Sequence, residues 1–242
     1  MNANGGVRHP ASGSRVSERT GRSRLYRMPA GQAVAALPPG SISILVTDPP
    51  YTTVDRHAGS GHLRRWFPGG MSWAEIGRIL AVARRKLRPD GIAFMMSNTD
   101  GLRDALTAME RAGFAKVRIV TWDKRAPGLG GGLRHQTEYV LVGLLPGSRT
   151  LTGVDLVSVP AVGPGTAGRY PTEKPAGLGR KLAKIAGIGP GDVVLDPFCG
   201  SGALLVGARE RGAVVLGCDI APAAIRRAQA KLGVRGTGTA RD

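Results

Sequence analysis

The stretch Val193-Val194-Leu195-Asp196-Pro197-Phe198-Cys199-Gly200-Ser201-Gly202 decides the fold that this sequence predicts. Its first three residues are apolar, as expected for a strand that is buried on both faces of a parallel sheet. The glycines that follow let the backbone turn and approach a ligand closely at the start of a helix. We therefore expect a strand, a ligand-binding turn and a helix in this order.

Strand and helix patterns alternate on both sides of this stretch. After it, the sequence predicts a helix over 203–211, a strand over 214–218 and a helix over 222–232. Before it, strands are predicted at 24–27, 42–46, 92–96, 117–122 and 139–144, and helices at 32–37, 102–111 and 175–185. Such alternation is typical of an α/β fold with a doubly wound sheet. The 242 residues suffice for one large domain of this kind.

Local signals mark one helix start and one turn. Ser72 and Glu75 have the spacing of a capping box, and Met71 and Ile76 are placed to form a hydrophobic staple around it. We expect a helix to begin there. The residues Pro89-Asp90-Gly91 predict a turn.

A second short motif, Asp48-Pro49-Pro50-Tyr51, directly follows the apolar run 42–46. The carboxylate of Asp48 and the carbonyl of Pro49 can each accept a hydrogen bond from an amine, and the prolines stiffen the turn. An exocyclic base amine is a poor nucleophile because its lone pair is delocalised into the ring. Accepting its hydrogens frees that lone pair, and Tyr51 can stack on a base that has been rotated out of a duplex. The alternative is a helix-capping Asp48 and a core Tyr51.

The two motifs together, and their order along the chain, resemble the permuted β class of DNA amino-methyltransferases, which use S-adenosylmethionine. The resemblance extends from about Ser23 to Leu232. It implies an α/β fold with a Rossmann-like, doubly wound mixed sheet of the S-adenosylmethionine-dependent methyltransferase type. It also implies methyl transfer to adenine N6 or cytosine N4 of DNA. Adenine is preferred, because Asp-Pro-Pro-Tyr more often accompanies adenine in the families that it resembles.

The resemblance also implies where the cofactor binds. Asp219 ends the next predicted strand, where a carboxylate can accept both ribose hydroxyls, and Ile220 can pack on the adenine. The segment Tyr170–Pro175 resembles the one that completes the methionine pocket in this family, although Thr172 could simply cap a helix and Lys174 could be a solvated charge. The residues expected to bind the cofactor are Thr172, Lys174, Asp196, Phe198, Gly200, Gly202, Asp219 and Ile220.

Some features depart from this family or favour other interpretations. The family usually has Thr where this chain has Ala203, and a Gly-Asp pair where this chain has Met28-Pro29, which affects the adenine contacts. A dinucleotide-binding motif is disfavoured because Leu205 stands where a third small residue is needed. The chain has no Pro-Cys pair, which disfavours methylation at cytosine carbon 5.

The net charge of +17 and the pI of about 11.2 favour a polyanionic partner, here double-stranded DNA. A basic and aromatic set follows the second motif, and the segments 122–124 and 134–139 resemble the hairpin beside the target pocket in this family. The residues expected to bind nucleic acid are Arg56, Arg64, Arg65, Trp66, Lys124 and Arg134. A solvated loop and a surface hairpin are the alternatives.

We expect residues 1–22 to form a disordered basic tail and 23–242 to form a single domain, in which 52–70 and the loose Gly/Pro-rich segment 145–169 are target-recognition loops. No apolar run approaches the roughly 20 residues that span a bilayer. The two cysteines and the loop histidines have no metal-ligand spacing, so no metal is expected. The sequence thus predicts a cytoplasmic enzyme and leaves its oligomeric state open, a dimer included. RNA methylation, or a nucleic-acid-binding protein with weak catalysis, remains as an alternative.

Overall fold

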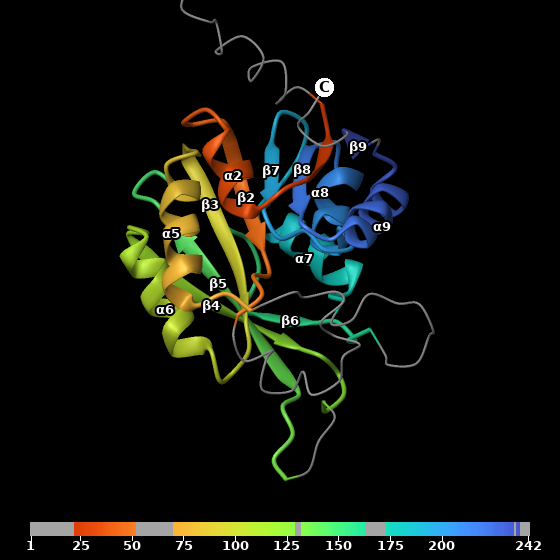
Figure 1. Cartoon of the computed structure of the whole chain (residues 1–242). Helices are drawn as coiled ribbons and strands as arrows, with labels where there is room; N and C mark the ends of the chain where they lie inside the picture. Colours follow the sequence, from red (N-terminus) through yellow and green to blue (C-terminus); the bar gives the residue numbers. More distant parts are fainter. Residues whose placement is uncertain (1–21, 52–69, 129–131, 163–172, 235, 238–242) are drawn as a thin grey trace, which may run out of the picture.

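The computed structural model describes residues 22–51, 70–128, 132–162, 173–234 and 236–237. The strands of this part of the chain are β1 (Arg24–Arg27), β2 (Ile42–Thr47), β3 (Leu87–Ser97), β4 (Lys116–Asp123), β5 (Thr137–Leu144), β6 (Leu156–Ser158), β7 (Val193–Asp196), β8 (Val214–Asp219) and β9 (Gly236–Thr237). They form one nine-stranded sheet in the order β6-β4-β5-β3-β2-β7-β8-β1-β9 (Figure 1). Strand β5 is antiparallel to β3 and β4, and the other pairs are parallel.

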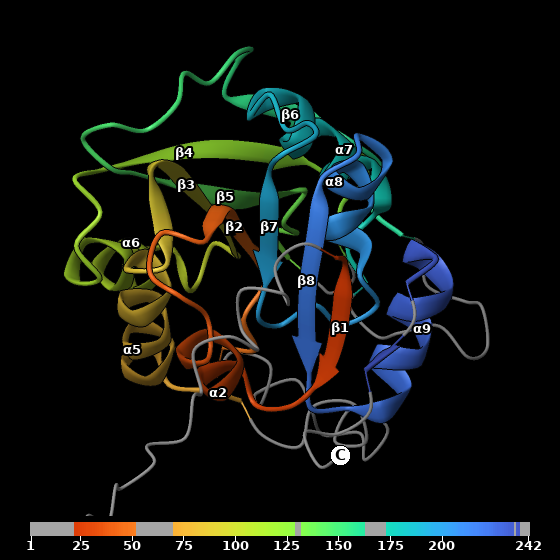
Figure 2. The ribbon, with the colours of Figure 1, turned by 90° about the horizontal axis from the view of Figure 1, so that it is seen from above.

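Helices cover both faces of this sheet. One face carries α2 (Ala30–Ala35), α5 (Trp73–Arg84) and α6 (Leu102–Arg111), and the other carries α7 (Ala176–Ile185), α8 (Val206–Glu210) and α9 (Pro222–Leu232), as Figure 2 shows. Each face has its own core of buried apolar side chains, which includes Ile76 and Met109 on the first face and Leu178 and Ile225 on the second. The expected α/β fold with a doubly wound mixed sheet is therefore confirmed.

The central strands have their apolar side chains buried on both faces. All six residues of β2 are buried, as are all four residues of β7. These two strands are parallel neighbours, with Ile44 opposite Val194 and Leu45 opposite Leu195. Parallel neighbours end at the same edge of a sheet, so this pairing sets where the two motifs lie.

Several local predictions agree with the structure. Helices α6 and α9 have the predicted bounds, and the strands predicted at 117–122 and 139–144 form an antiparallel pair. At the start of α5, Ser72 accepts a hydrogen bond from the backbone N–H of Glu75, whose carboxylate accepts the N–H of Ser72. The expected capping box is thus present.

Other local predictions need correction. The turn expected at 89–91 lies inside β3, at a shift of register where Ile42 pairs with Leu87 and Ile44 with Ile92. Between these two pairs, β3 has more residues than β2, and the chain continues in the same direction. The helix expected at 32–37 is α2, which begins at Ala30 because Pro29 takes the extended conformation of an N-cap. The helix expected at 203–211 begins as a 3₁₀ turn over Ala203–Leu205.

The segment 145–169, which the sequence predicts to be loose, is tied in part to the body of the protein. Strand β6 pairs in parallel with β4, and the indole N–H of Trp122 donates to the carbonyl of Val159 at 2.7 Å. Residues 163–169 of this segment, and residues 1–21 of the predicted tail, lie outside the described part of the chain.

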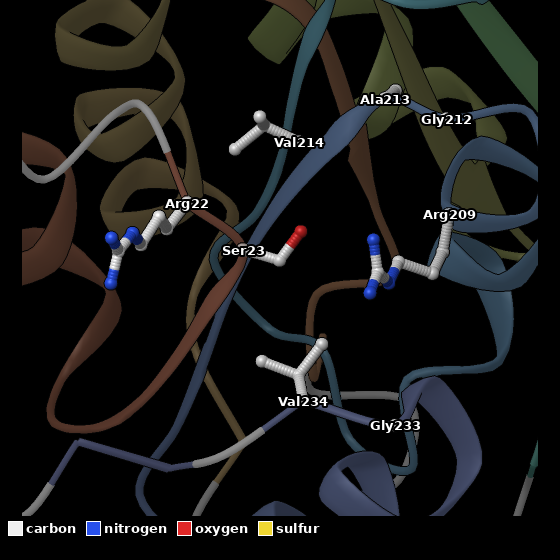
Figure 3. Close-up of a pocket in the computed structure, with 8 residues that line it drawn as sticks. All are labelled: Arg22, Ser23, Arg209, Gly212, Ala213, Val214, Gly233 and Val234. Atoms are coloured by element: carbon white, nitrogen blue, oxygen red, sulfur yellow. The ribbon is translucent and has the colours of Figure 1, made fainter.

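A cavity of about 360 Å³ lies at the end of the sheet where β8 begins, opposite the end where Asp219 terminates this strand (Figure 3). Ser23 and Arg209 line it, and the Nε of Arg209 donates to the carbonyl of Leu232 at 3.4 Å. None of the predicted site residues lines this cavity. In the described part of the chain, no helix has the length and apolar character that crossing a membrane requires.

The guanidinium of Arg149 joins three segments near the start of β7. It donates two hydrogen bonds to Asp192, at 2.8 and 3.0 Å, and one to Asp90 at 2.8 Å. Burial alone would raise the pKa of Asp192, but the hydrogen bonds from Arg149 and from the N–H of Gly189 lower it below the ordinary value of 3.8. A carboxyl with a lowered pKa stabilises the fold above its unfolded pKa and loses that contribution as the pH falls through its folded pKa.

We predict that Arg149→Met lowers the free energy of unfolding by about 1.5–3 kcal/mol at pH 7, because it leaves the carboxylate of Asp192 without its cation. The difference in the free energy of unfolding between wild type and Arg149→Met should shrink as the pH falls below about 4, where the carboxyl of Asp192 becomes protonated. Urea unfolding at several pH values measures both effects. Arg180→Met is the matched control, because its bidentate pair with Glu210 is exposed and should contribute little. An equal loss in both variants would contradict the prediction.

Candidate functional site

Three carboxylates lie at the ends of neighbouring strands. Asp48 directly follows β2, Asp196 is the last residue of β7, and Asp219 is the last residue of β8. The charges of Asp48 and Asp219 act on Asp196, whose pKa is raised well above its ordinary value, first by burial and then by these two neighbours. The sheet order therefore brings both motifs to the carboxyl ends of two neighbouring strands, β2 and β7. In doubly wound sheets, ligands bind at such a point.

Asp48 forms a close ion pair across the site. The Nζ of Lys174 lies 2.6 Å from Oδ2 of Asp48 and 3.8 Å from Oε2 of Glu138. The Nζ of Lys124 lies 3.4 Å from Oε1 of the same glutamate. Two lysines and two carboxylates thus form a chain of alternating charge. We refer to Asp48, Lys174, Glu138 and Lys124 as the charge chain.

In the charge chain, burial and the attraction between opposite charges have opposite effects on the pKa values. Burial raises the pKa of Asp48, and the ammonium of Lys174 opposes this effect. Burial alone would lower the pKa of Lys174, but Asp48 and Glu138 more than compensate, so its pKa is raised. Lys174 therefore stays protonated at neutral pH.

The rest of the second motif is held by backbone contacts and by one aromatic pair. The carbonyl of Pro49 accepts the N–H of Tyr51 at 3.0 Å, and the carbonyl of Pro50 accepts the N–H of Met71 at 2.6 Å. Tyr51 is buried and stacks on Trp73, with 5.3 Å between the ring centres and 11° between the planes. Burial raises the pKa of its hydroxyl, so the phenol stays neutral. Trp73 is the first residue of α5 and belongs to neither motif, so this contact was missed.

The loop between β7 and α8 is ordered by the two other carboxylates. Oδ1 of Asp196 accepts the N–H of Phe198 at 3.0 Å. The two oxygens of Asp219 accept the N–H groups of Gly200 and Ala221, at 3.1 and 2.8 Å. Each carboxylate oxygen keeps a further lone pair, so Asp219 can still accept from a ligand.

Gly202 shows why this loop needs glycine. Its φ of 78° lies in the left-handed region, and a Cβ atom there would lie 2.9 Å from Cδ1 of Leu232 on α9. A larger residue would therefore strain the backbone and push the loop away from α9.

A second polar contact holds this loop and was not predicted. The hydroxyl of Ser201 donates to Oε1 of Glu173 at 2.9 Å, and Lys231 of α9 donates to the same carboxylate. Glu173 lies in the segment 170–175 that the resemblance assigns to the cofactor, so the sequence could have indicated Glu173 as a site residue. Thr172 of that segment lies outside the described residues.

The side of the site next to β1 is apolar. Met28 and Phe198 pack around Cys218, and the backbone N–H of Met28 donates to the carbonyl of Asp219 at 3.2 Å. Ile220 follows, and it is 49% exposed although it is apolar. An exposed apolar residue beside a carboxylate acceptor suits a nucleoside.

The residues predicted to bind nucleic acid are placed only in part. Arg134 is exposed, whereas the side chain of Lys124 is 13% exposed and is paired with Glu138 in the charge chain. Arg56, Arg64, Arg65 and Trp66 lie outside the described residues. Within the described ranges, no group of three His, Cys, Asp or Glu side chains is arranged to hold a metal ion.

The sequence comparisons match methyltransferases, one of which acts on tRNA by its name. A family model described as DNA methylase matches residues 148–230, which contain α7, β7, the loop to Gly202 and β8. The type II methyltransferase M2.DpnII of Streptococcus pneumoniae is 27% identical over 160 residues, which are 58% of this chain and 59% of that protein. The tRNA (guanine(10)-N2)-dimethyltransferase of Methanocaldococcus jannaschii is 49% identical over 43 residues, 18% of this chain and 12% of that protein.

The structural likeness covers more of the chain. TTHA0409 of Thermus thermophilus, described as a DNA modification methylase, aligns with a TM-score of 0.65 and 23% identity over 89% of this chain and 97% of its own. The structure of that protein complexed with S-adenosyl-L-methionine aligns with a TM-score of 0.63 and 22% identity over 87% of this chain and 95% of its own. This likeness shows a shared fold. The chain spans about three fifths of the length of M2.DpnII. The expected resemblance to the DNA amino-methyltransferases is confirmed.

Proposed function

We propose that this protein transfers a methyl group from S-adenosylmethionine to an exocyclic amine of a DNA base, with adenine N6 preferred over cytosine N4. The observation that carries the proposal is the parallel pairing of β2 with β7, which places Asp48 and the loop ending at Gly202 at one edge of the sheet. The match of residues 148–230 to the DNA methylase model supports it. In this proposal, residues 23–242 work as one methyltransferase domain in the cytoplasm.

The chemistry of the residues on the β7–β8 side fits the cofactor. Asp219 retains acceptor capacity for ribose hydroxyls, and the exposed Ile220 offers an apolar surface to the adenine. The backbone of Gly200 and Gly202 allows close approach. The methionine end is assigned to Asp196, Phe198, Thr172 and Lys174. When bound, the cofactor supplies an electrophilic methyl group.

The second motif is assigned to the target amine. Asp48 accepts one amine hydrogen, and the carbonyl of Pro49, which has a second lone pair besides the one used by Tyr51, accepts the other. Holding both hydrogens frees the nitrogen lone pair for attack. Tyr51 is assigned to stacking on the extruded base; one face of its ring stacks on Trp73 and the ring is buried, so the base has to displace the groups that cover the other face. After methyl transfer, the amine releases one proton on the side that faces Asp48.

One observation favours a second candidate, methylation of an RNA amine. The short match to the tRNA (guanine(10)-N2)-dimethyltransferase has the higher identity, 49%, but covers only 18% of this chain. DNA is the first choice because the family model is described as DNA methylase and TTHA0409 as a DNA modification methylase. A binding protein with weak catalysis is the third candidate, since the family usually has a Gly-Asp pair beside the adenine where this chain has Met28-Pro29.

The first test of the function uses labelled S-adenosylmethionine with unmethylated double-stranded DNA, followed by digestion to nucleosides. We expect label in N6-methyldeoxyadenosine, and Asp48→Ala should lower the rate by about 10²–10³-fold because a hydrogen bond made in the transition state is lost. Cofactor binding should be nearly unchanged in that variant. Asp104→Ala, an exposed acid on α6, is the control. Label found only in RNA, or turnover by Asp48→Ala at the wild-type rate, would contradict the assignment.

For the cofactor side, we predict that Asp219→Ala weakens S-adenosylmethionine binding by about 10–100-fold, as expected when hydrogen bonds to a charged group are lost. DNA binding should change little. Titration calorimetry with each ligand separates the two effects, and Asp155→Ala, an exposed acid before β6, is the control. Unchanged cofactor affinity would place the ribose site elsewhere.

The specificity prediction concerns the segments 52–70 and 145–169, which we propose as target-recognition loops. The second contains few long polar side chains, and base readout needs such side chains in the major groove. The charge of +17 should therefore supply most of the affinity through phosphates. We expect a short or degenerate target site and binding that falls steeply with salt, with a slope of about −0.9 per phosphate contacted. Mapping methylated positions on genomic DNA checks this. Methylation confined to one long sequence would contradict it.

A further inference from the structure

Two consecutive residues, Glu173 and Lys174, contact the two halves of the site separately. Glu173 accepts from Ser201, inside the loop between β7 and α8, and from Lys231 of α9. Lys174 donates to Asp48, which follows β2. The contacts of one dipeptide therefore span both motifs, although Asp48 and Lys174 are 126 residues apart in the sequence.

The contact with Asp48 is enclosed. The side chain of Lys174 is 12% exposed and that of Asp48 is 23% exposed, and their contacting atoms are 2.6 Å apart. An ammonium and a carboxylate at this distance form a charge-assisted hydrogen bond, which fixes orientation more firmly than a neutral one. Lys174 uses only Oδ2 of Asp48, and no described residue donates to Oδ1. Among the described residues, Asp48 is thus held by one of its two carboxylate oxygens.

We propose that Lys174 is a positioning residue for the target amine, which holds Asp48 by Oδ2 so that Oδ1 faces the amine, and that Glu173 ties this lysine to the cofactor loop. The inference deepens the proposed function, because it rests on Asp48 receiving the amine. Ordering of the cofactor loop is then transmitted to Asp48 through one peptide unit. The cofactor-binding role assigned to Lys174 by resemblance is compatible with this, since an ammonium has three N–H donors.

The charges around Asp48 explain why a cation is needed there. Glu138 and Asp196 are acidic and face it from β5 and β7, and Tyr51 lies beside it with a neutral phenol. Lys124 lies on the far side of Glu138. Without Lys174, burial and two carboxylates would all favour the protonated form of Asp48. A protonated carboxyl is a poorer acceptor for an amine hydrogen.

The first experiment measures Asp48 in the protein without substrate. Carbon-13 NMR of the side-chain carboxyls is followed against pH, and Asp48→Asn identifies the resonance. In Lys174→Met, which keeps the length of the side chain but not the charge, the midpoint should move to higher pH by about 1–3 units, the usual effect of an opposite charge at this range. In Lys174→Arg, the midpoint of Asp48 should return to its wild-type value. Lys184→Met, an exposed lysine on α7, the helix that follows Lys174, should leave the midpoint unmoved. A midpoint that is the same in wild type and Lys174→Met would overturn the proposal.

The second experiment measures turnover. The acid limb of kcat/KM should move to higher pH in Lys174→Met, with Lys174→Arg close to wild type. In wild type, we expect the cofactor analogue sinefungin to tighten DNA binding, measured as the ratio of the Kd values with and without it. Glu173→Gln should keep the wild-type acid limb but bring this ratio to about one. An unchanged ratio in Glu173→Gln would overturn the tie between the two halves.

The two experiments separate this inference from the proposed function. If wild type methylates no amine at all, the proposed function fails, whereas the NMR result still decides whether Lys174 controls the carboxylate of Asp48. If Lys174→Met does not fold, Lys174→Gln takes its place in both measurements.

Discussion

The site depends on the parallel pairing of β2 with β7. The two strands share two residue pairs, Ile44 with Val194 and Leu45 with Leu195. Beside these pairs, the hydroxyl of the buried Ser43 accepts the N–H of Val193 at 3.1 Å. Ser43 and Val193 are 150 positions apart in sequence, so the contact forms only when the whole sheet assembles. Because parallel strands end at a common edge, this one pairing fixes the first motif beside the second. Without it, the two motifs would belong to separate halves of the sheet.

The second constraint is the cost of placing carboxylates close together away from water. Burial raises the pKa of Asp48, Asp196 and Asp219 alike. The protein offsets this in two ways. Asp196 accepts the N–H of Phe198 and Asp219 that of Gly200, both in the loop between β7 and α8, so these bonds shape the cofactor side. Asp219 also accepts the N–H of Ala221, just before α9. Asp48 instead receives the ammonium of Lys174 on Oδ2, which opposes the effect of burial on its pKa.

The sequence predicted best what local chemistry determines. The bounds of α6 and α9 and the capping box at Ser72 follow from periodicity and from hydrogen bonding within a few residues. Strand β6 was missed because three residues in a Gly/Pro-rich segment form a strand only where β4 offers its edge. The residues of both motifs could be named, because their neighbours along the chain identify them. Their partners could not, because Lys231 and Trp73 reach the site from elements that only the fold brings there. Glu138 lies in the segment 134–139 that was expected beside the target pocket, but its proximity to Lys174 was not predicted. A motif therefore predicts which residues matter better than it predicts what they touch.

The distribution of charge gives the two halves of the proposed reaction different surroundings. The chain has 34 basic and 17 acidic residues, yet the edge that carries the motifs holds the carboxylates of Asp48, Glu138, Asp196 and Asp219. A basic surface attracts the phosphates of a nucleic acid over distances of about one Debye length. Two of these carboxylates, Asp48 and Glu138, are paired with Lys174 and Lys124. Carboxylate oxygens can accept the N–H groups of a base, whereas phosphate oxygens donate no hydrogen to them, since phosphates are themselves acceptors. A polyanion is thus attracted to the molecule as a whole, while the acceptors of the site suit the donors of a base.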